Sequence, residues 1–123
     1  HREAMEDGLA ERLVTAIAAQ DQAAITACFA SDAQFTALTP NGIRERSGAE
    51  ETGALFARWF GDATVLDLEG SEATEVAEKR RIAYRFTGIE DDEAFVVEQQ
   101  LYCTVQDGLI ERAELLCSGF LPR

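Results

Sequence analysis

The sequence predicts an α+β domain in which three helices pack on one face of a curved antiparallel sheet. Two observations carry this prediction. Apolar residues recur at helical spacing as far as Gly61, and after it they alternate with polar residues, as in half-buried strands. The length of 123 residues suffices for one hydrophobic core without disulfide or metal support. We therefore expect a single domain over residues 1–123.

The first two helices follow from apolar residues that share one face. Between residues 3 and 19 this face carries Met5, Leu9, Leu13, Val14 and Ile17. Asp21 is the expected N-cap of a second helix, because a short side-chain oxygen there can accept a free backbone N–H. Its apolar positions are Ile25, Cys28 and Phe29, and the helix is expected to end near Ala30.

The third helix is expected to begin at a capping box. In this motif the Ser47 hydroxyl accepts the backbone N–H of Glu50, and the Glu50 carboxylate reaches back. The buried face of this helix would carry Leu55, Phe56, Trp59 and Phe60. Before it, residues 32–38 are typical of a short strand, closed by a turn at 39–42.

The last two strands, over 95–106 and 109–120, are joined by Asp107-Gly108, a strong hairpin signal. With these two residues as the turn, Gln106 lies opposite Leu109, and the alternation of side chains defines two faces. One face would carry Glu98, Gln100, Tyr102, Ala113, Leu115 and Cys117. The other would carry Gln99, Leu101, Cys103, Val105, Ile110, Arg112, Glu114 and Leu116. A bulge of one residue would exchange the two faces.

The composition argues against several functions. With 11 Lys and Arg against 23 Asp and Glu, the net charge is −12 at pH 7, which disfavours nucleic acid and anionic membranes as partners. No apolar run approaches the roughly 20 residues that span a bilayer, so we expect a cytoplasmic protein. The one histidine, His1, excludes sites that need two imidazoles. The acidic run 90–93 lacks the glycine and the ligand spacing of a calcium loop. We expect no metal and no cofactor.

The cysteines are expected to be reduced thiols. Their number, three, is odd, and Cys103 and Cys117 would lie on opposite faces of the hairpin, where they cannot form a disulfide. A nucleophilic cysteine would need a neighbouring base, and the sequence offers no imidazole for that role.

Three motifs in their order carry a family resemblance: Phe29-Ala30-Ser31-Asp32-Ala33, Ser47-Gly48-Ala49-Glu50-Glu51 and Val105-Gln106-Asp107-Gly108-Leu109-Ile110. Together with the order of elements, they resemble the nuclear transport factor 2-like superfamily, particularly its SnoaL-like branch. The resemblance covers nearly the whole chain. It implies a single SnoaL-like domain, a cone-shaped α+β barrel open at one end that often dimerises through the outer face of its sheet. The resemblance therefore indicates where a site would lie, inside the cone, but it does not indicate which reaction or ligand the site serves.

The resemblance to ketosteroid isomerase and limonene epoxide hydrolase implies that the face with Glu98 lines the cone. It also implies that their catalytic groups are missing. The isomerase tyrosine and base fall on Leu13 and Ala37, and its second aspartate falls on Gln100 or Leu101. The hydrolase aspartate falls on Leu115. Scytalone dehydratase chemistry needs two pocket histidines, which the composition excludes.

Seven residues remain as candidates for a site in the cone. Glu98 is the expected proton-transfer group, with Tyr102 as hydrogen-bond donor, because a desolvated carboxylate has a raised pKa. The expected ligand contacts are Trp59, Tyr84, Gln100, Leu115 and Cys117. In the competing interpretation Glu98 only pairs with Arg80 or Arg85, and the aromatic residues belong to the core.

Three functional hypotheses follow. In the first, the cone binds a small, largely apolar molecule without catalysis. In the second, the protein is an isomerase or lyase, of the ketosteroid isomerase or cyclase kind, that uses Glu98. In the third, it is a dimerisation module acting through an outer face with Leu101, Cys103, Arg112 and Glu114. A homodimer through the outer sheet face is expected in each case.

Overall fold

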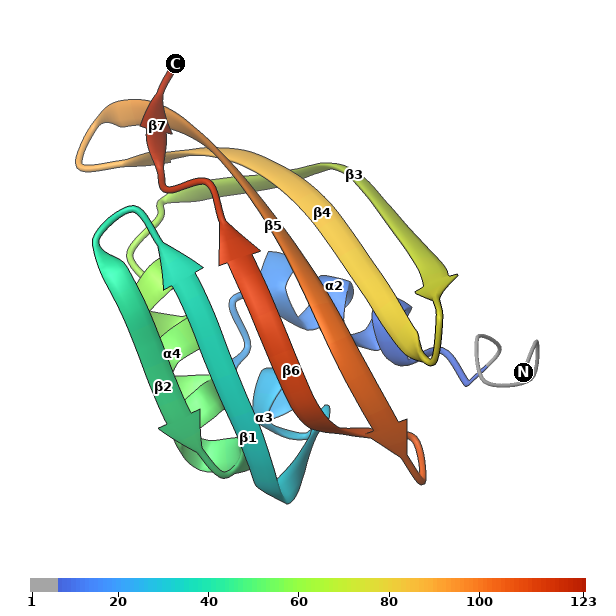
Figure 1. The fold of residues 1–123 in the computed structure, drawn as a ribbon. Coiled ribbons are helices and arrows are strands. Elements are labelled where there is room, and N and C mark those ends of the chain that lie inside the picture. Colours follow the sequence, from blue (N-terminus) through green and yellow to red (C-terminus); the bar gives the residue numbers. More distant parts are fainter. Residues whose placement is uncertain (1–6) are drawn as a thin grey trace.

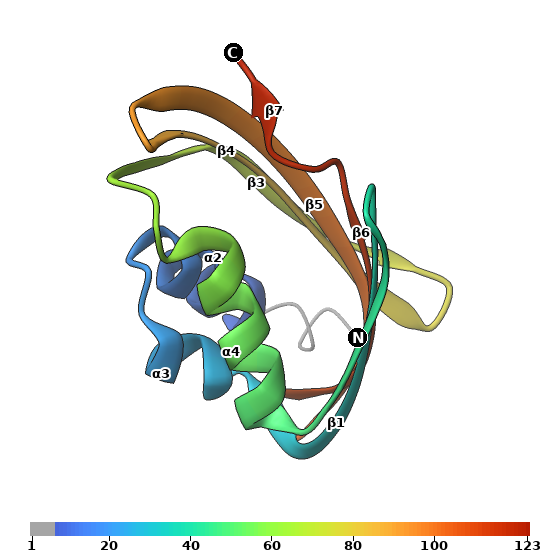
Figure 2. The same ribbon diagram turned by 90° about the vertical axis from the view of Figure 1, so that its left-hand side faces the viewer.

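The computed structural model describes residues 7–123 and shows three helices on the concave side of one curved sheet (Figure 1, Figure 2). The helices are α2 (Leu9–Ala18), α3 (Gln22–Thr26) and α4 (Ala49–Phe60). The strands are β1 (Phe29–Thr39), β2 (Gly42–Ser47), β3 (Val65–Val76), β4 (Lys79–Glu90), β5 (Glu93–Gln106), β6 (Leu109–Cys117) and β7 (Leu121–Pro122). The predicted α+β class is confirmed.

The sheet is mixed and open. Its strands lie in the order β2-β1-β6-β5-β4-β3, and β7 adds to β5 beyond the end of β6. β1 runs parallel to β6, and the other pairs are antiparallel. The predicted antiparallel sheet thus has one parallel junction, β1 with β6, because local hairpin signals do not report the direction of strands that meet from distant parts of the chain. Among the described residues the edges β2 and β3 do not pair, so the cone is not a closed barrel.

The first two helices are shorter than predicted. The segment 3–6 lies outside the described residues, and α2 begins at Leu9. Asp21 is the N-cap of α3, and its carboxylate accepts the Ala24 N–H at 3.1 Å. This helix ends at Thr26, not near Ala30, because Phe29 already pairs with Ile110 in the sheet. The strand expected over 32–38 is correspondingly longer.

The predicted capping box of the third helix was wrong by one residue. Gly48 is the N-cap, with no side-chain cap, and Ser47 is the last residue of β2. The Ser47 N–H donates instead to Glu51 Oε1 at 3.1 Å. Strand β2 was not predicted, because Gly42-Ile43-Arg44-Glu45-Arg46-Ser47 has a single large apolar residue.

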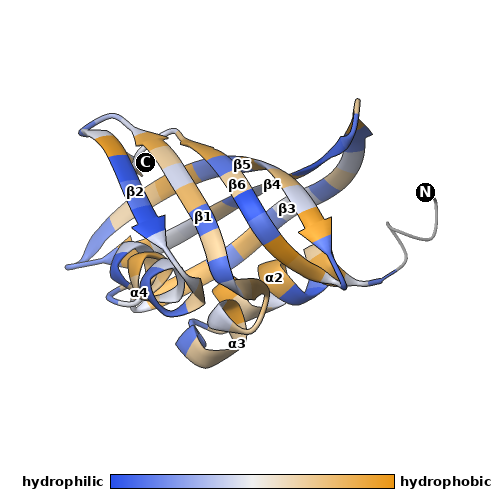
Figure 3. Cartoon of the chain, turned by 60° about the horizontal axis from the view of Figure 1, so that its bottom comes forward, coloured by the Kyte–Doolittle hydropathy of each residue, from blue (hydrophilic) through white to orange (hydrophobic). Residues whose placement is uncertain are grey.

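The core lies between the helices and the concave face of the sheet. Hydrophilic and hydrophobic residues alternate along several strands (Figure 3), and the buried positions of the sheet lie on β1, β4, β5 and β6. The largest fully buried side chains are Phe35, Phe56, Phe60 and Phe86. Gln20 fixes the end of α4 by donating from Nε2 to the carbonyls of Phe60 and Ala63, at 2.7 and 3.0 Å. These two hydrogen bonds connect the end of α2 to the C-terminal end of α4.

Candidate functional site

A β-bulge in the last hairpin decides which residues face the cone. Gln106 lies opposite Leu109, as predicted, but Thr104 lies opposite Arg112, which leaves Glu111 without a partner on β5. From Thr104 back to Gln99, the register between β5 and β6 is shifted by one residue. A residue of β5 that was predicted to share a face with Leu115 and Cys117 therefore lies on the opposite face. The predicted faces were therefore wrong for β5 and right for β6 from Arg112 onward, whereas Ile110, predicted on the outer face, is fully buried.

Leu115 and Cys117 point into the cone, as predicted, and both are buried. Gln99, Leu101 and Cys103 join them there, in place of Glu98, Gln100 and Tyr102. Cys103 and Cys117 thus share a face, contrary to the prediction. They stay free thiols, as expected, because they pair with Ala113 and Gln99, about 13 Å apart along the strands.

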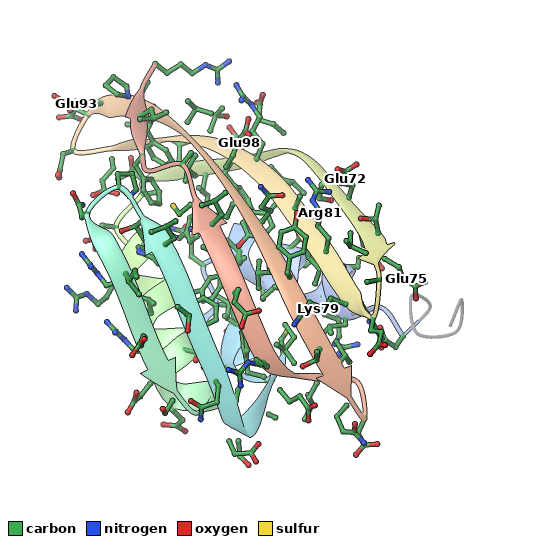
Figure 4. The ribbon with its side chains drawn as sticks, in the orientation of Figure 1. Glu72, Glu75, Lys79, Arg81, Glu93 and Glu98 are labelled. Atoms are coloured by element: carbon green, nitrogen blue, oxygen red, sulfur yellow. The ribbon has the colours of Figure 1, made fainter. Side chains whose placement is uncertain are left out.

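Glu98 lies on the outer face of the sheet, where its side chain is 58% exposed (Figure 4). Its carboxylate accepts a hydrogen bond from Arg85 at 2.5 Å, so one of the two predicted arginine partners is confirmed. This exposed, paired carboxylate does not have the apolar surroundings that the proton-transfer prediction assumed. The surroundings on which the predicted proton-transfer role of Glu98 depended are therefore absent.

Gln100 and Tyr102 lie beside Glu98 on the outer face, not in the cone. Arg81 donates to Gln100 Oε1 at 2.9 Å and to Glu72 Oε1 at 2.7 Å. The hydrogen bond with Glu72 raises the pKa of Arg81 further above its usual value. Gln100, Arg81 and Glu98 border a shallow depression of about 490 Å³ on this face.

Inside the cone, three side chains form a buried hydrogen-bonded cluster, here called the polar triad: Tyr84, Gln99 and Cys117. The Tyr84 hydroxyl donates to Gln99 Oε1 at 2.6 Å, and Gln99 Nε2 donates to Cys117 Sγ at 3.3 Å. The Gly119 N–H also donates to that sulfur at 3.3 Å. Sequence reasoning placed Tyr84 and Cys117 correctly and missed Gln99, because only the bulge turns it inward.

The polar triad offers hydrogen bonds without charge. Burial raises the pKa of Tyr84 well above its usual 10.0, so this phenol stays protonated at neutral pH. Four residues beyond Gln99 along β5, burial raises the pKa of the Cys103 thiol to about 11, which makes it a poor nucleophile. A phenol, an amide and a thiol can orient a ligand's polar group, but none of them is a strong base at neutral pH.

The open end of the cone forms a pocket of about 730 Å³, here called the mouth. Its apolar lining is Trp59, Phe95, Phe120, Pro122 and Ala94, and its charged lining is Arg58, Glu90, Asp91, Glu93 and Arg123. This volume lies within the roughly 300–1,000 Å³ of small-molecule sites. Of the predicted ligand residues, Trp59 is the one that reaches this opening.

An aromatic chain leads from the mouth to the polar triad. Phe95 contacts Phe120, Phe120 contacts Phe60, and Phe60 contacts Phe86, with ring centroids 5.3, 5.5 and 5.6 Å apart. Phe86 in turn lies 5.7 Å from Tyr84. The narrow part of the cone is thus filled by the protein's own rings, and the open space lies at the mouth.

Two glycines shape the mouth. A Cβ at Gly88 would lie 2.7 Å from the Phe95 ring and would also meet the Val65 carbonyl, so only glycine lets this ring pack so closely against β4. Gly119 has a φ of +88°, and a Cβ there would lie 2.8 Å from the Pro40 ring. This left-handed turn follows directly after β6 and precedes Phe120, which packs between Phe60 and Phe95.

Among the described residues, no group of three or more His, Cys, Asp or Glu side chains is placed to hold a metal ion. None of the helices in this part of the chain is long and apolar enough to cross a membrane.

An open cone of this strand order, wrapped around three N-terminal helices, defines the nuclear transport factor 2-like class of fold. Within this class the chain belongs to the SnoaL-like domain family, whose profile matches residues 10–113. No protein with a curated description matches the sequence.

Solved structures agree on the fold. A hypothetical protein with a ketosteroid isomerase-like fold from Catenulispora acidiphila, in complex with trimethylamine, superposes with a TM-score of 0.74 at 15% identity, over 90% of this chain and 85% of that one. A candidate polyketide cyclase from Xanthomonas campestris gives 0.73 at 19% identity, over 94% and 90%. An epoxide hydrolase resembling limonene epoxide hydrolase, from M. tuberculosis, gives 0.69 at 15% identity, over 95% and 84%.

The positions that the isomerase and hydrolase resemblances single out are apolar and buried here. Leu13, Ala37 and Leu101 are fully buried, and Leu115 is 3% exposed. The alternative position for the isomerase aspartate, Gln100, lies outside the cone. The cone wall at these places therefore contributes packing and no acid or base.

Proposed function

We propose that this SnoaL-like domain binds a small, largely apolar molecule at the mouth of its cone without transforming it. The aromatic lining of the mouth carries this proposal. Trp59, Phe95 and Phe120 surround an opening of about 730 Å³, and burying aromatic surface against a ligand is favourable at roughly 25 cal/mol per Å². A structural neighbour in complex with trimethylamine gives the fold a precedent for holding a small molecule.

A thermal-shift screen tests the proposal. Compact aromatic and alicyclic compounds should raise the melting temperature, because a ligand that binds only the folded state stabilises it. Trp59 is the only tryptophan, so the same compounds should change the intrinsic fluorescence in a saturable way. Stabilisation without any change in Trp59 emission would place the site elsewhere. No hit in a broad apolar set would refute the proposal.

The alternative of an isomerase or lyase with Glu98 as proton-transfer group, assisted by Tyr102, stays a prediction without structural support. Glu98→Gln provides its test. The alternative requires turnover to be abolished in this variant while the fold stays intact. The binding proposal requires ligand affinity to be unchanged.

We also propose that the outer face of the sheet binds a second copy of this chain. Three exposed apolar side chains adjoin there across β2, β1 and β6: Ile43, Leu38 and Leu116, exposed by 62, 51 and 47%. Adjoining apolar residues on an uncovered face are typical of protein interfaces. Of the predicted interface residues, Arg112 and Glu114 lie on this face, but Leu101 and Cys103 are buried inside the cone. Sedimentation velocity at micromolar concentration should show a dimer, and a monomer alone would refute this proposal.

A further inference from the structure

The mouth carries charges of both signs around its aromatic floor. On one side stand three carboxylates of the β4–β5 hairpin: Glu90, Asp91 and Glu93. The guanidiniums that line the same pocket come from other elements, Arg58 from α4 and Arg123 from the segment after β7. In the part of the chain that the structure describes, none of these five side chains forms an ion pair or hydrogen bond.

These unpaired charges differ from those of three arginines on the outer face of the sheet. On the outer face, Arg85 pairs with Glu98, Arg81 with Glu72 and Arg112 with Glu114. The guanidiniums there are neutralised by their neighbours, whereas those of the mouth stay available. Charges that border a pocket and lack protein partners can pair with a ligand.

The β4–β5 hairpin brings its carboxylates close together, where they repel one another. Asp91 and Asp92 have φ angles of 53° and 66°, which fit the tight two-residue turns of hairpins. Glu90 and Glu93 are therefore directly opposite each other in the ladder. Like charges in this arrangement destabilise a hairpin, and a bound cationic group would relieve their repulsion.

We propose that the mouth recognises a zwitterionic small molecule with an apolar body, of the class of aromatic or branched amino acids. The body lies on Trp59, Phe95 and Phe120. The ammonium group faces Glu90 and Glu93, and the carboxylate faces Arg58. This inference rests on the proposed binding function and names the ligand class of the same site.

Four related probes test the charge preference separately from binding itself. These are phenylalanine, its amide, its N-acetyl derivative and the N-acetyl amide, which are zwitterion, cation, anion and neutral molecule on one apolar body. Titrations followed by Trp59 emission should rank the zwitterion first and the neutral compound last. Each added charge should improve affinity about fivefold, the size of one exposed charge pair.

Two variants assign the charges. Glu93→Gln should lower the affinity for the zwitterion and for the cation about fivefold and leave the affinity for the other two probes unchanged. Arg58→Gln should lower the affinity for the zwitterion and for the anion by a similar factor. Glu72→Gln and Arg81→Gln, which remove the same kinds of charge from the outer face, should leave the affinity for all four probes unchanged. Salt should reduce all charge-dependent differences, because the rim is exposed.

The outcomes separate the two proposals. Equal affinity for all four probes, or equal effects in the control variants, would overturn the zwitterion inference and leave the binding function intact. No binding of any of the four, together with no hit in the apolar screen, would overturn the binding function itself.

Discussion

The polar triad makes the sharpest stability prediction. Tyr84→Phe removes the hydroxyl that donates to Gln99 Oε1 at 2.6 Å. Tyr84 is 4% exposed and Gln99 is 2% exposed, so water cannot readily replace the lost donor. An unsatisfied buried acceptor costs about 1–3 kcal/mol. We expect this loss in the free energy of unfolding, measured by urea denaturation and circular dichroism.

A second substitution shows whether the cost comes from the hydrogen bond. Gln99→Met replaces the amide by an apolar chain of similar length. In the double variant neither partner needs the other, so its destabilisation should be less than the sum of the two single variants by about 1 kcal/mol. Strict additivity, or a Tyr84→Phe variant as stable as the wild type, would show that the two side chains are not bonded in the core.

Four further predictions concern pH, the surface and assembly. From pH 9.0 through about 11, the free energy of unfolding should fall, because the unfolded Cys103 thiol ionises near 9.0 while burial keeps the folded thiol protonated to about 11. Cys103→Ala should flatten this slope in urea titrations, and an unchanged slope would count against the assignment. The hydrogen bond from Arg80 lowers the pKa of Asp7 below 3.8, so its stabilisation should be complete above that pH and be lost as pH falls through the lowered pKa. Arg80→Gln should cost about 0.5–1 kcal/mol at pH 7 and nothing in strong acid, and an equal cost at both pH values would refute this reading. Glu98→Gln should change stability by at most about 0.5 kcal/mol, and a loss above ~2 kcal/mol would mean that Glu98 is not the exposed group seen here. Leu116→Glu should convert a dimer to monomers in sedimentation velocity while Glu111→Gln should not, and a dimer that survives Leu116→Glu would exclude this face.

The fold was predictable from short-range patterns. The change of period at Gly61, the Asp21 cap and the Asp107-Gly108 turn each act within a few residues, and the structure has all three. Features that depend on distant partners could not be predicted. The parallel pairing of β1 with β6 and the early end of α3 at Thr26 both arise from a contact between segments about 80 residues apart.

The candidate site depended on one residue that carries no sequence signal. Glu111 is an ordinary polar strand residue, yet it is the extra residue of the bulge. This single insertion moved Glu98, Gln100 and Tyr102 outside and brought Gln99 inside. Trp59, Tyr84, Leu115 and Cys117 were placed correctly because their faces are set by helix α4, by β4 and by β6, on which the prediction had the right parity. The mouth itself is formed by the acidic hairpin and by Phe120, whose patterns indicate only a solvated turn and a strand end.

The most direct test of the central claim, that the mouth is the binding site, is a titration with the neutral fluorescent probe N-phenyl-1-naphthylamine. Glu93→Phe places a ring in the mouth, and its matched control Glu98→Phe places one at the depression on the outer face. The wild type and Glu98→Phe should bind the probe with saturation and a change in Trp59 emission, and Glu93→Phe should lose both. Binding that survives Glu93→Phe and disappears in Glu98→Phe would contradict the account and move the site to the outer face.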